Sequence, residues 1–206
     1  MTDDKLHEEC GVFGIYSPGE EVARLTFFGL YALQHRGQES AGIATSDGRR
    51  LYIRTHLGLV NQAFAEDDLK DLPGTIAIGH ARYSTTGASS ACNAGPMTAE
   101  SNVGPIAIAH NGNLVNALAL RQELEERGEH FSATTDSEIL TRLIALSPGD
   151  DIVTKIRRAM PRMIGAYSLA ILTTDRVLAV RDPLGVRPLC LGRLGERWVI
   201  ASESCA

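Results

Sequence analysis

Two segments of the chain share one pattern, in which isoleucines alternate with small residues and a histidine follows. Residues 76–80 read Ile-Ala-Ile-Gly-His, and residues 106–110 read Ile-Ala-Ile-Ala-His. Side chains alternate across a β-strand, so each segment would place its isoleucines on one face and its small residues on the other. Because neither face is polar, we expect both strands to be covered on both sides, the small residues allowing another layer to approach closely.

The rest of the chain alternates between strand and helix patterns. Strands are predicted at residues 11–16 and in three hairpins, 41–45 with 51–54, 167–173 with 177–181, and 189–191 with 198–201. Helices are predicted from Val22 toward a stop at Gly37, from a cap at Asn116 to Gly128, from a Thr135–Glu138 capping box through residue 144, and from Asp150 or Asp151 to Pro161. Hairpins at both ends favour an α+β layered domain over a doubly wound parallel sheet.

Length and charge narrow the class of protein further. The 206 residues, 44% hydrophobic and 22% charged, suit one globular domain. A net charge of −5 gives no basic surface for nucleic acid or anionic lipid. No apolar run approaches the roughly 18 residues of a membrane span, and the acidic start lacks the parts of a secretory signal. We therefore expect a cytoplasmic protein that acts on a small molecule, with no nucleic acid and no membrane partner.

One cysteine is placed where it could act as a nucleophile. The four cysteines, Cys10, Cys92, Cys190 and Cys205, form no C-x-x-C pair, which disfavours a zinc site or a disulfide framework. Cys10 lies between an acidic nonapeptide and an apolar strand, and such a cysteine is usually a small buried hydrophobe. If residues 1–9 are removed, however, Cys10 holds both a nucleophilic thiol and an α-amine, whose ordinary pKa of roughly 7.7–8.0 suits a base near neutral pH.

Five motifs carry a resemblance to a known family. They are residues 10–15 (CGVFGI), 35–43 (HRGQESAGI), 79–85 (GHARYST), 110–116 (HNGNLVN) and 135–138 (TDSE). In this order they resemble the glutaminase domain of the glutamine phosphoribosylpyrophosphate amidotransferases (amidophosphoribosyltransferases), which are class II glutamine amidotransferases. The resemblance implies the four-layer αββα sandwich of N-terminal-nucleophile hydrolases, with two antiparallel sheets. It also implies a removable propeptide at residues 1–9 and a glutaminase domain at 10–206, and the family's C-terminal phosphoribosyltransferase domain is absent from this chain.

The resemblance implies a catalytic role for three residues. Cys10 would attack the glutamine carboxamide, forming a thioester and releasing ammonia, and water would then release glutamate. The side-chain amide of Asn111 and the backbone N–H of Gly112 would hold the oxyanion, a role that in other enzymes contributes roughly 3–4 kcal/mol per donor. The alternative for Asn111 and Gly112 is a plain turn, because Asn-Gly is a common tight-turn dipeptide.

Two charged residues would bind the substrate's head group. Arg82 would bind the α-carboxylate of glutamine, for which a planar two-pronged donor is well suited, and its alternative is a surface salt bridge. Asp136 would bind the α-amino group, and by itself it is typical of an acidic residue in the first turn of a helix.

Four further residues are expected beside the nucleophile. Arg36 and Gly37 match the family's H-R-G turn, where the arginine orders the site and the glycine allows close backbone approach, and their alternative is a helix C-terminus with a glycine stop. Residues 82–93 are rich in small side chains and suit a lid over bound glutamine, with Tyr83 and Thr86 as lid contacts.

Metal chemistry is not expected in this chain. His80 and His110 would end neighbouring strands, but no third ligand has supportive spacing, so hydrogen-bonded framework histidines are the better interpretation. The glutaminase step needs no cofactor, and the resemblance places Mg²⁺ in the complete enzyme. Some family members also carry a [4Fe-4S] cluster, to which Cys205 would contribute only in a complete protein, because a cluster needs about four thiolates.

The sequence therefore predicts a glutaminase domain that supplies ammonia for phosphoribosylamine formation from phosphoribosyl pyrophosphate in purine synthesis. Its partners would be glutamine and, through the absent domain, phosphoribosyl pyrophosphate, and the complete protein would be a homo-oligomer. Two alternatives stay open, namely the glutaminase domain of another class II amidotransferase and a non-catalytic docking or regulatory module. Gln38 and Glu39 after Arg36-Gly37 disfavour the first, since other class II relatives more often have R-G-Y-D or R-G-P-D there.

Overall fold

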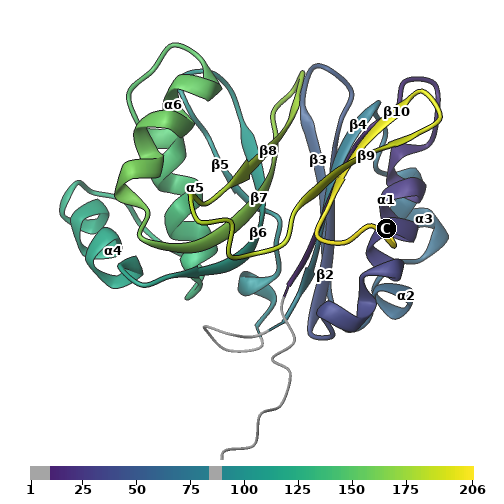
Figure 1. The fold of residues 1–206 in the computed structure, drawn as a ribbon, viewed down its shortest axis with the longest axis horizontal. Helices are drawn as coiled ribbons and strands as arrows, with labels where there is room; N and C mark the ends of the chain where they lie inside the picture. Colours follow the sequence, from purple (N-terminus) through teal and green to yellow (C-terminus); the bar gives the residue numbers. More distant parts are fainter. Residues whose placement is uncertain (1–9, 84–89) are drawn as a thin grey trace, which may run out of the picture.

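The computed structural model describes residues 10–83 and 90–206, which form four stacked layers (Figure 1). Two β-sheets lie face to face in the middle, with helices α4–α6 covering one outer face and helices α1–α3 covering the other (Figure 1). Every strand pairing within these sheets is antiparallel. The predicted α+β class and the αββα sandwich are therefore confirmed.

The first sheet has six strands, in the order β3-β2-β4-β1-β10-β9. Their bounds are β1 Gly11–Tyr16, β2 Ser40–Ser46, β3 Leu51–Leu57, β4 Ile76–Arg82, β9 Cys190–Leu194 and β10 Arg197–Ala201. The central strands β4 and β1 are in register from Gly11 opposite Ala81 to Tyr16 opposite Ile76. Cys10 therefore lies at the Arg82 end of the sheet.

The second sheet has four strands in the order β5-β6-β7-β8, and the helices complete the layers. The strands are β5 Met97–Ala99, β6 Ile106–Leu114, β7 Gly165–Leu172 and β8 Val177–Arg181. The helices are α1 Val22–Ala32, α2 Val60–Ala63, α3 Glu66–Lys70, α4 Ala117–Glu126, α5 Asp136–Leu146 and α6 Ile152–Ala159, with short 3-10 turns at Gln34–Arg36, Ala91–Asn93 and Met160–Arg162. None of the helices in the described ranges is long and apolar enough to cross a bilayer.

The two repeated segments lie in different sheets and pack in a complementary way. In β4, Ile76 and Ile78 belong to the core between the sheets, whereas Ala77 belongs to the core under α1. In β6 the arrangement is reversed, with Ala107 and Ala109 between the sheets and Ile106 and Ile108 under the helices of the second layer. The predicted burial of both faces is confirmed, and large side chains of one sheet pack against small side chains of the other.

Three local expectations differ from the structure. His80 and His110 do not end neighbouring strands, because β4 and β6 belong to different sheets. The helix from Val22 stops at Ala32, and a 3-10 turn carries the chain on to Arg36. The capping box before α5 does not form.

The Glu138 carboxylate explains the absence of that capping box. It accepts hydrogen bonds from the backbone N–H groups of Ser132 (3.1 Å) and Ala133 (2.6 Å) instead of reaching the cap residue Thr135. Glu138 therefore ties down the loop before α5 rather than the first turn of the helix.

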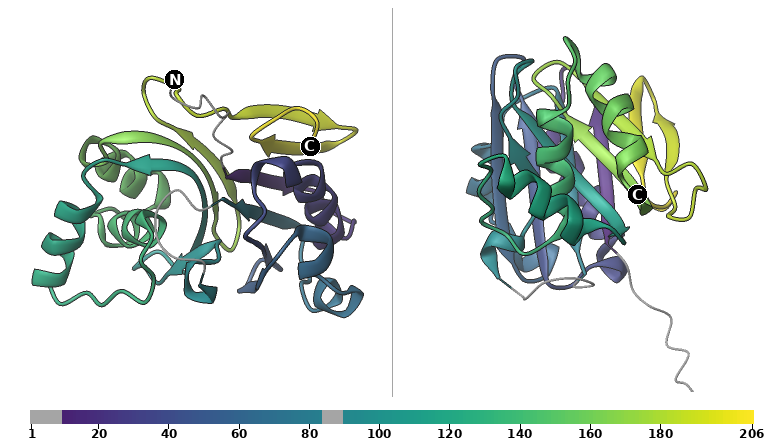
Figure 2. Two further views of the ribbon diagram at one scale, coloured as in Figure 1. Left: turned by 90° about the horizontal axis from the view of Figure 1, so that it is seen from below. Right: turned by 90° about the vertical axis from the view of Figure 1, so that its left-hand side faces the viewer.

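The segment that follows β10 folds back onto the first helix layer. In Figures 1 and 2 the C-terminus lies beside α1, and Ala206 packs against the core formed by α1 and the first sheet. This return brings the end of the chain close to the turn that follows α1.

Candidate active site

Cys10 lies directly before β1 and is buried. Its thiol donates a hydrogen bond to the backbone C=O of Tyr83, and the backbone N–H of Tyr83 donates one to the Cys10 sulfur, both at 3.4 Å. Val12, two residues later in the strand, packs between the sheets. Because side chains alternate along a strand, the thiol faces the second sheet. The sulfur is therefore held at the end of the space between the two sheets.

The charges around the thiol set its acidity. Burial raises the pKa of the Cys10 thiol above its ordinary value, and the charge of Asp136 acts in the same direction. The backbone of Tyr83 and the charge of Arg82 oppose this rise without cancelling it. The thiol is therefore protonated at neutral pH, so a nucleophilic attack by this sulfur requires a base that removes its proton.

Arg36 and Gly37 sit directly against the nucleophile and its neighbouring strand. The Nε of Arg36 donates a hydrogen bond to the backbone C=O of Cys10 at 3.2 Å. A Cβ on Gly37 would lie 2.5 Å from the backbone carbonyl atoms of Ala81, so only glycine allows the turn to approach β4 so closely. Arg36 therefore lies beside Cys10 and Gly37 beside the neighbouring strand β4, although α1 ends before both of them.

Arg82 forms a buried ion pair rather than a surface one. Its Nη1 donates to Oε1 of Glu39, and the side chains are only 5% and 12% exposed, respectively. The backbone N–H of Glu39 also donates to the C=O of Arg82 at 3.1 Å. The salt-bridge alternative for Arg82 is correct about the pairing and wrong about its location. Glu39 itself was not among the predicted site residues.

Asn111 and Gly112 lie inside strand β6, so the interpretation of this dipeptide as a turn is wrong. They pair with Ser168 and Tyr167 of β7. Gly112 has a φ of +150°, and a Cβ there would lie 2.0 Å from the backbone oxygen of Ala166. Asn111 is 1% exposed, and its Nδ2 makes no hydrogen bond within the described ranges. The strand therefore presents a buried amide donor on the side that faces the first sheet.

Asp136 connects this strand to the N-terminus of α5. Its Oδ2 accepts a hydrogen bond from the backbone N–H of Leu114 at 2.9 Å, and its Oδ1 lies 3.7 Å from Nδ1 of His110. Since the Asp136 charge acts on the Cys10 thiol, this end of β6 and the Cys10 end of the first sheet lie at the same side of the molecule.

The loop that leads into Asp136 is fixed by Asn93. The Asn93 Nδ2 donates to Thr134 Oγ1 and its Oδ1 accepts from the Thr134 backbone N–H, both at 2.9 Å. Asn93 has no motif of its own in the sequence, so only its place within residues 82–93 could have drawn attention to it.

The two buried histidines differ in their hydrogen bonding. His110 Nδ1 lies 3.0 Å from Ser137 Oγ, as expected for a framework histidine. Neither ring nitrogen of His80 makes a hydrogen bond of ordinary geometry to the described part of the chain. Burial lowers the pKa of His80 to about 3, helped by the charges of His110 and Arg82 and only slightly opposed by the backbone of His110. His80 is therefore neutral at physiological pH.

The remaining predicted residues are divided between described and undescribed parts. Tyr83 follows β4 and contacts the Cys10 sulfur through its backbone, whereas Thr86 lies outside the described residues. Cys205 is exposed, with its sulfur 3.8 Å from the C=O of Ala32. Within residues 10–83 and 90–206, no three His, Cys, Asp or Glu side chains gather in a way that could hold a metal ion.

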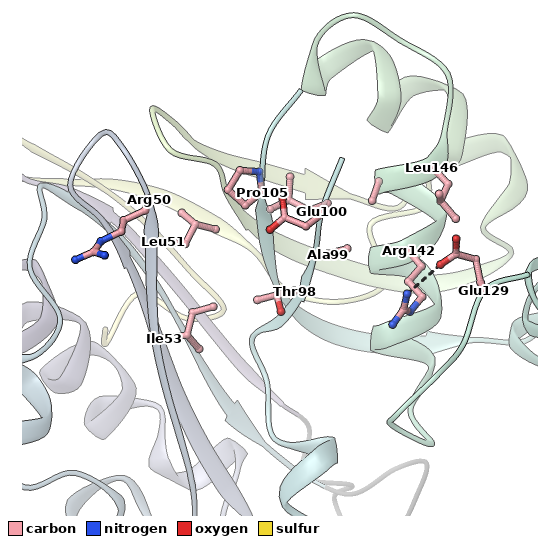
Figure 3. A pocket seen from close by; sticks show the side chains of 12 residues that line it. Arg50, Leu51, Ile53, Thr98, Ala99, Glu100, Pro105, Glu129, Arg142 and Leu146 are labelled. Carbon is pink, nitrogen blue, oxygen red and sulfur yellow. Dashed lines mark hydrogen bonds and ion pairs between the residues drawn. The ribbon is translucent and has the colours of Figure 1, made fainter. Parts of the chain in front are cut away.

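A cavity lies elsewhere, at the opposite end of the sheets. It has a volume of about 670 Å³ and opens between β3, β5 and α5, with Leu51, Ile53, Thr98 and Arg142 in its wall (Figure 3). Leu51 is aligned with the Ile76 end of the first sheet, whereas Cys10 adjoins the Arg82 end. None of the predicted site residues lines this cavity.

The fold and the buried cysteine at the head of a central strand define the class as an αββα sandwich of the N-terminal-nucleophile type. Residues 80–206 match the family described as a glutamine amidotransferase domain, and the chain belongs to that family.

Relatives of known name agree with this assignment. Amidophosphoribosyltransferase from Synechocystis sp. is 54% identical over 98% of this chain, and the enzyme of the same name from Methanocaldococcus jannaschii is 48% identical over 96%. A solved structure of glutamine phosphoribosylpyrophosphate amidotransferase from B. subtilis, complexed with ADP and GMP, superposes with a TM-score of 0.88 at 42% identity over 95% of this chain. The chain spans 42% of the length of each of these relatives.

Proposed function

We propose that this chain is the glutaminase part of an amidophosphoribosyltransferase and that Cys10 is its nucleophile. The observation that carries the proposal is the setting of the Cys10 thiol, whose pKa responds to the cation of Arg82 and to the anion of Asp136. A free amino acid carries an α-carboxylate and an α-ammonium group. One fixed cation and one fixed anion beside a nucleophile suit the recognition of such a head group.

The proposed reaction uses groups of this chain alone. Removal of residues 1–9 frees the α-amine of Cys10, which takes the proton of the thiol as the sulfur bonds to the carboxamide carbon of glutamine. The negative charge on the former carbonyl oxygen is held by the Asn111 amide and the Gly112 N–H. The carbon–nitrogen bond then breaks, the α-amine returns a proton to the leaving nitrogen, and ammonia departs from a γ-glutamyl thioester. Water deprotonated by the same amine hydrolyses the thioester to glutamate.

The other predicted residues have supporting roles in this proposal. Arg82 binds the α-carboxylate and Asp136 the α-amino group, while Arg36 and Gly37 hold the backbone around the nucleophile. Tyr83 and Thr86 contact bound glutamine as parts of a lid. The Asn111 Nδ2 supports the oxyanion role, because it is a buried donor with no hydrogen-bond partner within the described ranges, and buried donors are normally hydrogen-bonded.

The complete protein would use the ammonia in a phosphoribosyltransferase part, forming phosphoribosylamine from phosphoribosyl pyrophosphate in cytoplasmic purine synthesis. Mg²⁺ would act there, and the complete protein would be a homo-oligomer. The described residues could not hold a [4Fe-4S] cluster by themselves, because no three of their Cys, His, Asp or Glu side chains gather at one place. In a complete protein Cys205 would supply one of the roughly four thiolates that a cluster needs. We assign no step of the glutaminase reaction to a metal.

The test is release of ammonia from glutamine, combined with N-terminal sequencing of the purified protein. We expect the active form to begin at Cys10 and Cys10→Ala to lose activity at least about 1000-fold. Cys92→Ala is the matched control, since Cys92 is exposed and should be dispensable. Full activity of Cys10→Ala, or of protein that retains residues 1–9, would overturn the proposal.

A further inference from the structure

One carboxylate joins the end of the described chain to the backbone of the nucleophile. Glu203, just after β10, accepts a hydrogen bond from Nη1 of Arg36 at 2.5 Å on its Oε1. Its other oxygen, Oε2, lies 3.0 Å from Nε2 of His35. The same Arg36 side chain donates from Nε to the C=O of Cys10. A continuous path of hydrogen bonds therefore runs from Glu203 through Arg36 to Cys10. Glu203 and Arg36 are 167 positions apart in the sequence.

The burial of Arg36 shows why it needs a counter-charge. Its side chain is 12% exposed and lies between the turn after α1 and the nucleophile, whereas Glu203 is 34% exposed. A guanidinium removed from water is costly unless a carboxylate is hydrogen-bonded to it. Because each Glu203 oxygen has its own donor, the carboxylate is also fixed in rotation, and the guanidinium is held in one orientation.

We propose that Glu203 is a positioning residue for the glutaminase reaction, which holds the Arg36 guanidinium against the Cys10 carbonyl. The inference rests on the proposed function, because it concerns the same nucleophile. Once residues 1–9 are removed, the Cys10 amine has a covalent connection on only one side. The position of the amine relative to the thiol is then set by rotation about the bond between the Cys10 Cα and its carbonyl carbon, and Arg36 holds that carbonyl group in place. Catalytic groups misplaced by about 1 Å cost on the order of 100-fold in rate, so this anchor bears directly on turnover.

The same arrangement affects the charge of the amine. Among the described residues, the charges of Arg82 and Asp136 act on the Cys10 thiol, and the Arg36 guanidinium is hydrogen-bonded to the Cys10 carbonyl. The Glu203 carboxylate, paired with Arg36, offsets the charge of that guanidinium. Replacing Glu203 by glutamine removes a negative charge and leaves the arginine in place. The protonated amine then becomes less favourable, so the amine keeps its basic form to lower pH.

The experiment compares Glu203→Gln and Glu203→Ala with the active wild type across pH 5–9. For Glu203→Gln we expect the acid limb of kcat/KM to move to lower pH by about half a unit. For Glu203→Ala we expect kcat to fall about 10–100-fold with KM within about twofold. Titration of active sites with a glutamine-like electrophile, followed by mass, gives the competent fraction, so a loss caused only by misfolding is recognised.

The control is Glu196→Gln, which removes the same charge from the turn of the β9–β10 hairpin. Glu196 is 99% exposed and lies 3.6 Å from Arg193, so it should leave kinetics and pH profile unchanged. An equal shift in Glu196→Gln, or wild-type kinetics in both Glu203 variants beside an active wild type, would overturn this inference alone. Absence of ammonia release from the wild type would overturn the proposed function as well.

Discussion

The Cys10 thiol and the Tyr83 backbone are hydrogen-bonded to each other in both directions, each bond at 3.4 Å. This pair of hydrogen bonds joins the residue before β1 to the residue after β4. Strands β1 and β4 are the central strands of the first sheet. It fixes the sulfur without using any side chain other than that of the cysteine. The thiol is consequently positioned by the fold but is not activated by it.

The first prediction concerns the reactivity of this thiol. In protein that retains residues 1–9, Cys10 should be alkylated by iodoacetamide at least about tenfold more slowly than exposed Cys92 at pH 7.5, because burial raises the pKa of its thiol. Its rate should still be rising above pH 9. Peptide mass spectrometry of both sites measures this, and protein that begins at Cys10 serves as the comparison. Equal rates at the two cysteines would contradict the prediction.

The second prediction concerns the backbone of β6. Gly112→Ala should destabilise the protein by more than the roughly 1–3 kcal/mol expected from a strained φ alone, because the new methyl group would also collide with the Ala166 carbonyl. Urea unfolding measures the change. Gly19→Ala is the control, since Gly19 also has a positive φ, of +83°, but nothing within 4 Å of its Cβ position. Similar losses in both variants would show that the collision is relieved.

The third prediction concerns acid stability. The pKa of His80 is about 3 in the folded state and near 6.5 in the unfolded chain, so between these values the unfolded state binds a proton that the folded state does not. The free energy of unfolding should therefore fall as the pH falls from 6.5 toward 3. His80→Leu should flatten this slope, while buried His110, whose pKa is also lowered, continues to contribute. Urea midpoints at pH 4–7 measure the slope, and an unchanged slope would show that His80 becomes charged in the folded protein.

The fourth prediction concerns the ion pair of Arg82 with Glu39. Glu39→Gln should lower stability by about 3–5 kcal/mol, because it removes the carboxylate charge that Glu39 places against the buried Arg82 guanidinium. If Arg82 binds the α-carboxylate of glutamine, the ligand should restore part of this loss. In a Cys10→Ala background that prevents turnover, glutamine should then raise the melting temperature of Glu39→Gln more than that of the parent. An equal rise of the melting temperature in both proteins would show that Arg82 does not bind the α-carboxylate of glutamine.

Much of the fold could be predicted because its strands carry strong local patterns. The alternation in residues 76–80 and 106–110 indicated two-sided burial, but it could not show that the segments lie in different sheets, since pairing is decided by distant parts of the chain. Strand Met97–Ala99 and helices Val60–Ala63 and Glu66–Lys70 were missed because three to five residues are too few to display a period.

The candidate site was predictable to the extent that it follows motifs. Cys10, Arg36, Arg82, Asn111 and Asp136 were named from the sequence, and their catalytic and binding roles stay predictions. Glu39, Asn93 and Glu203 were missed as site residues because their partners lie 43, 41 and 167 positions away, respectively. Such pairings leave no local trace in a single sequence.

Strands β4 and β6 turn their isoleucines in opposite directions, one toward the space between the sheets and the other away from it. This arrangement limits which substitutions the domain can accept. Ile78 of the first sheet and Ala109 of the second belong to the same core between the sheets. The distance between the two sheets is therefore set by one large and one small side chain together. A larger side chain in place of an alanine there would push the two sheets apart. It would also move Cys10 away from Asn111, because these residues lie on the facing sides of the two sheets. Substitutions in the core between the sheets should therefore be tolerated only in compensating pairs, in which a larger residue in one sheet is matched by a smaller residue in the other.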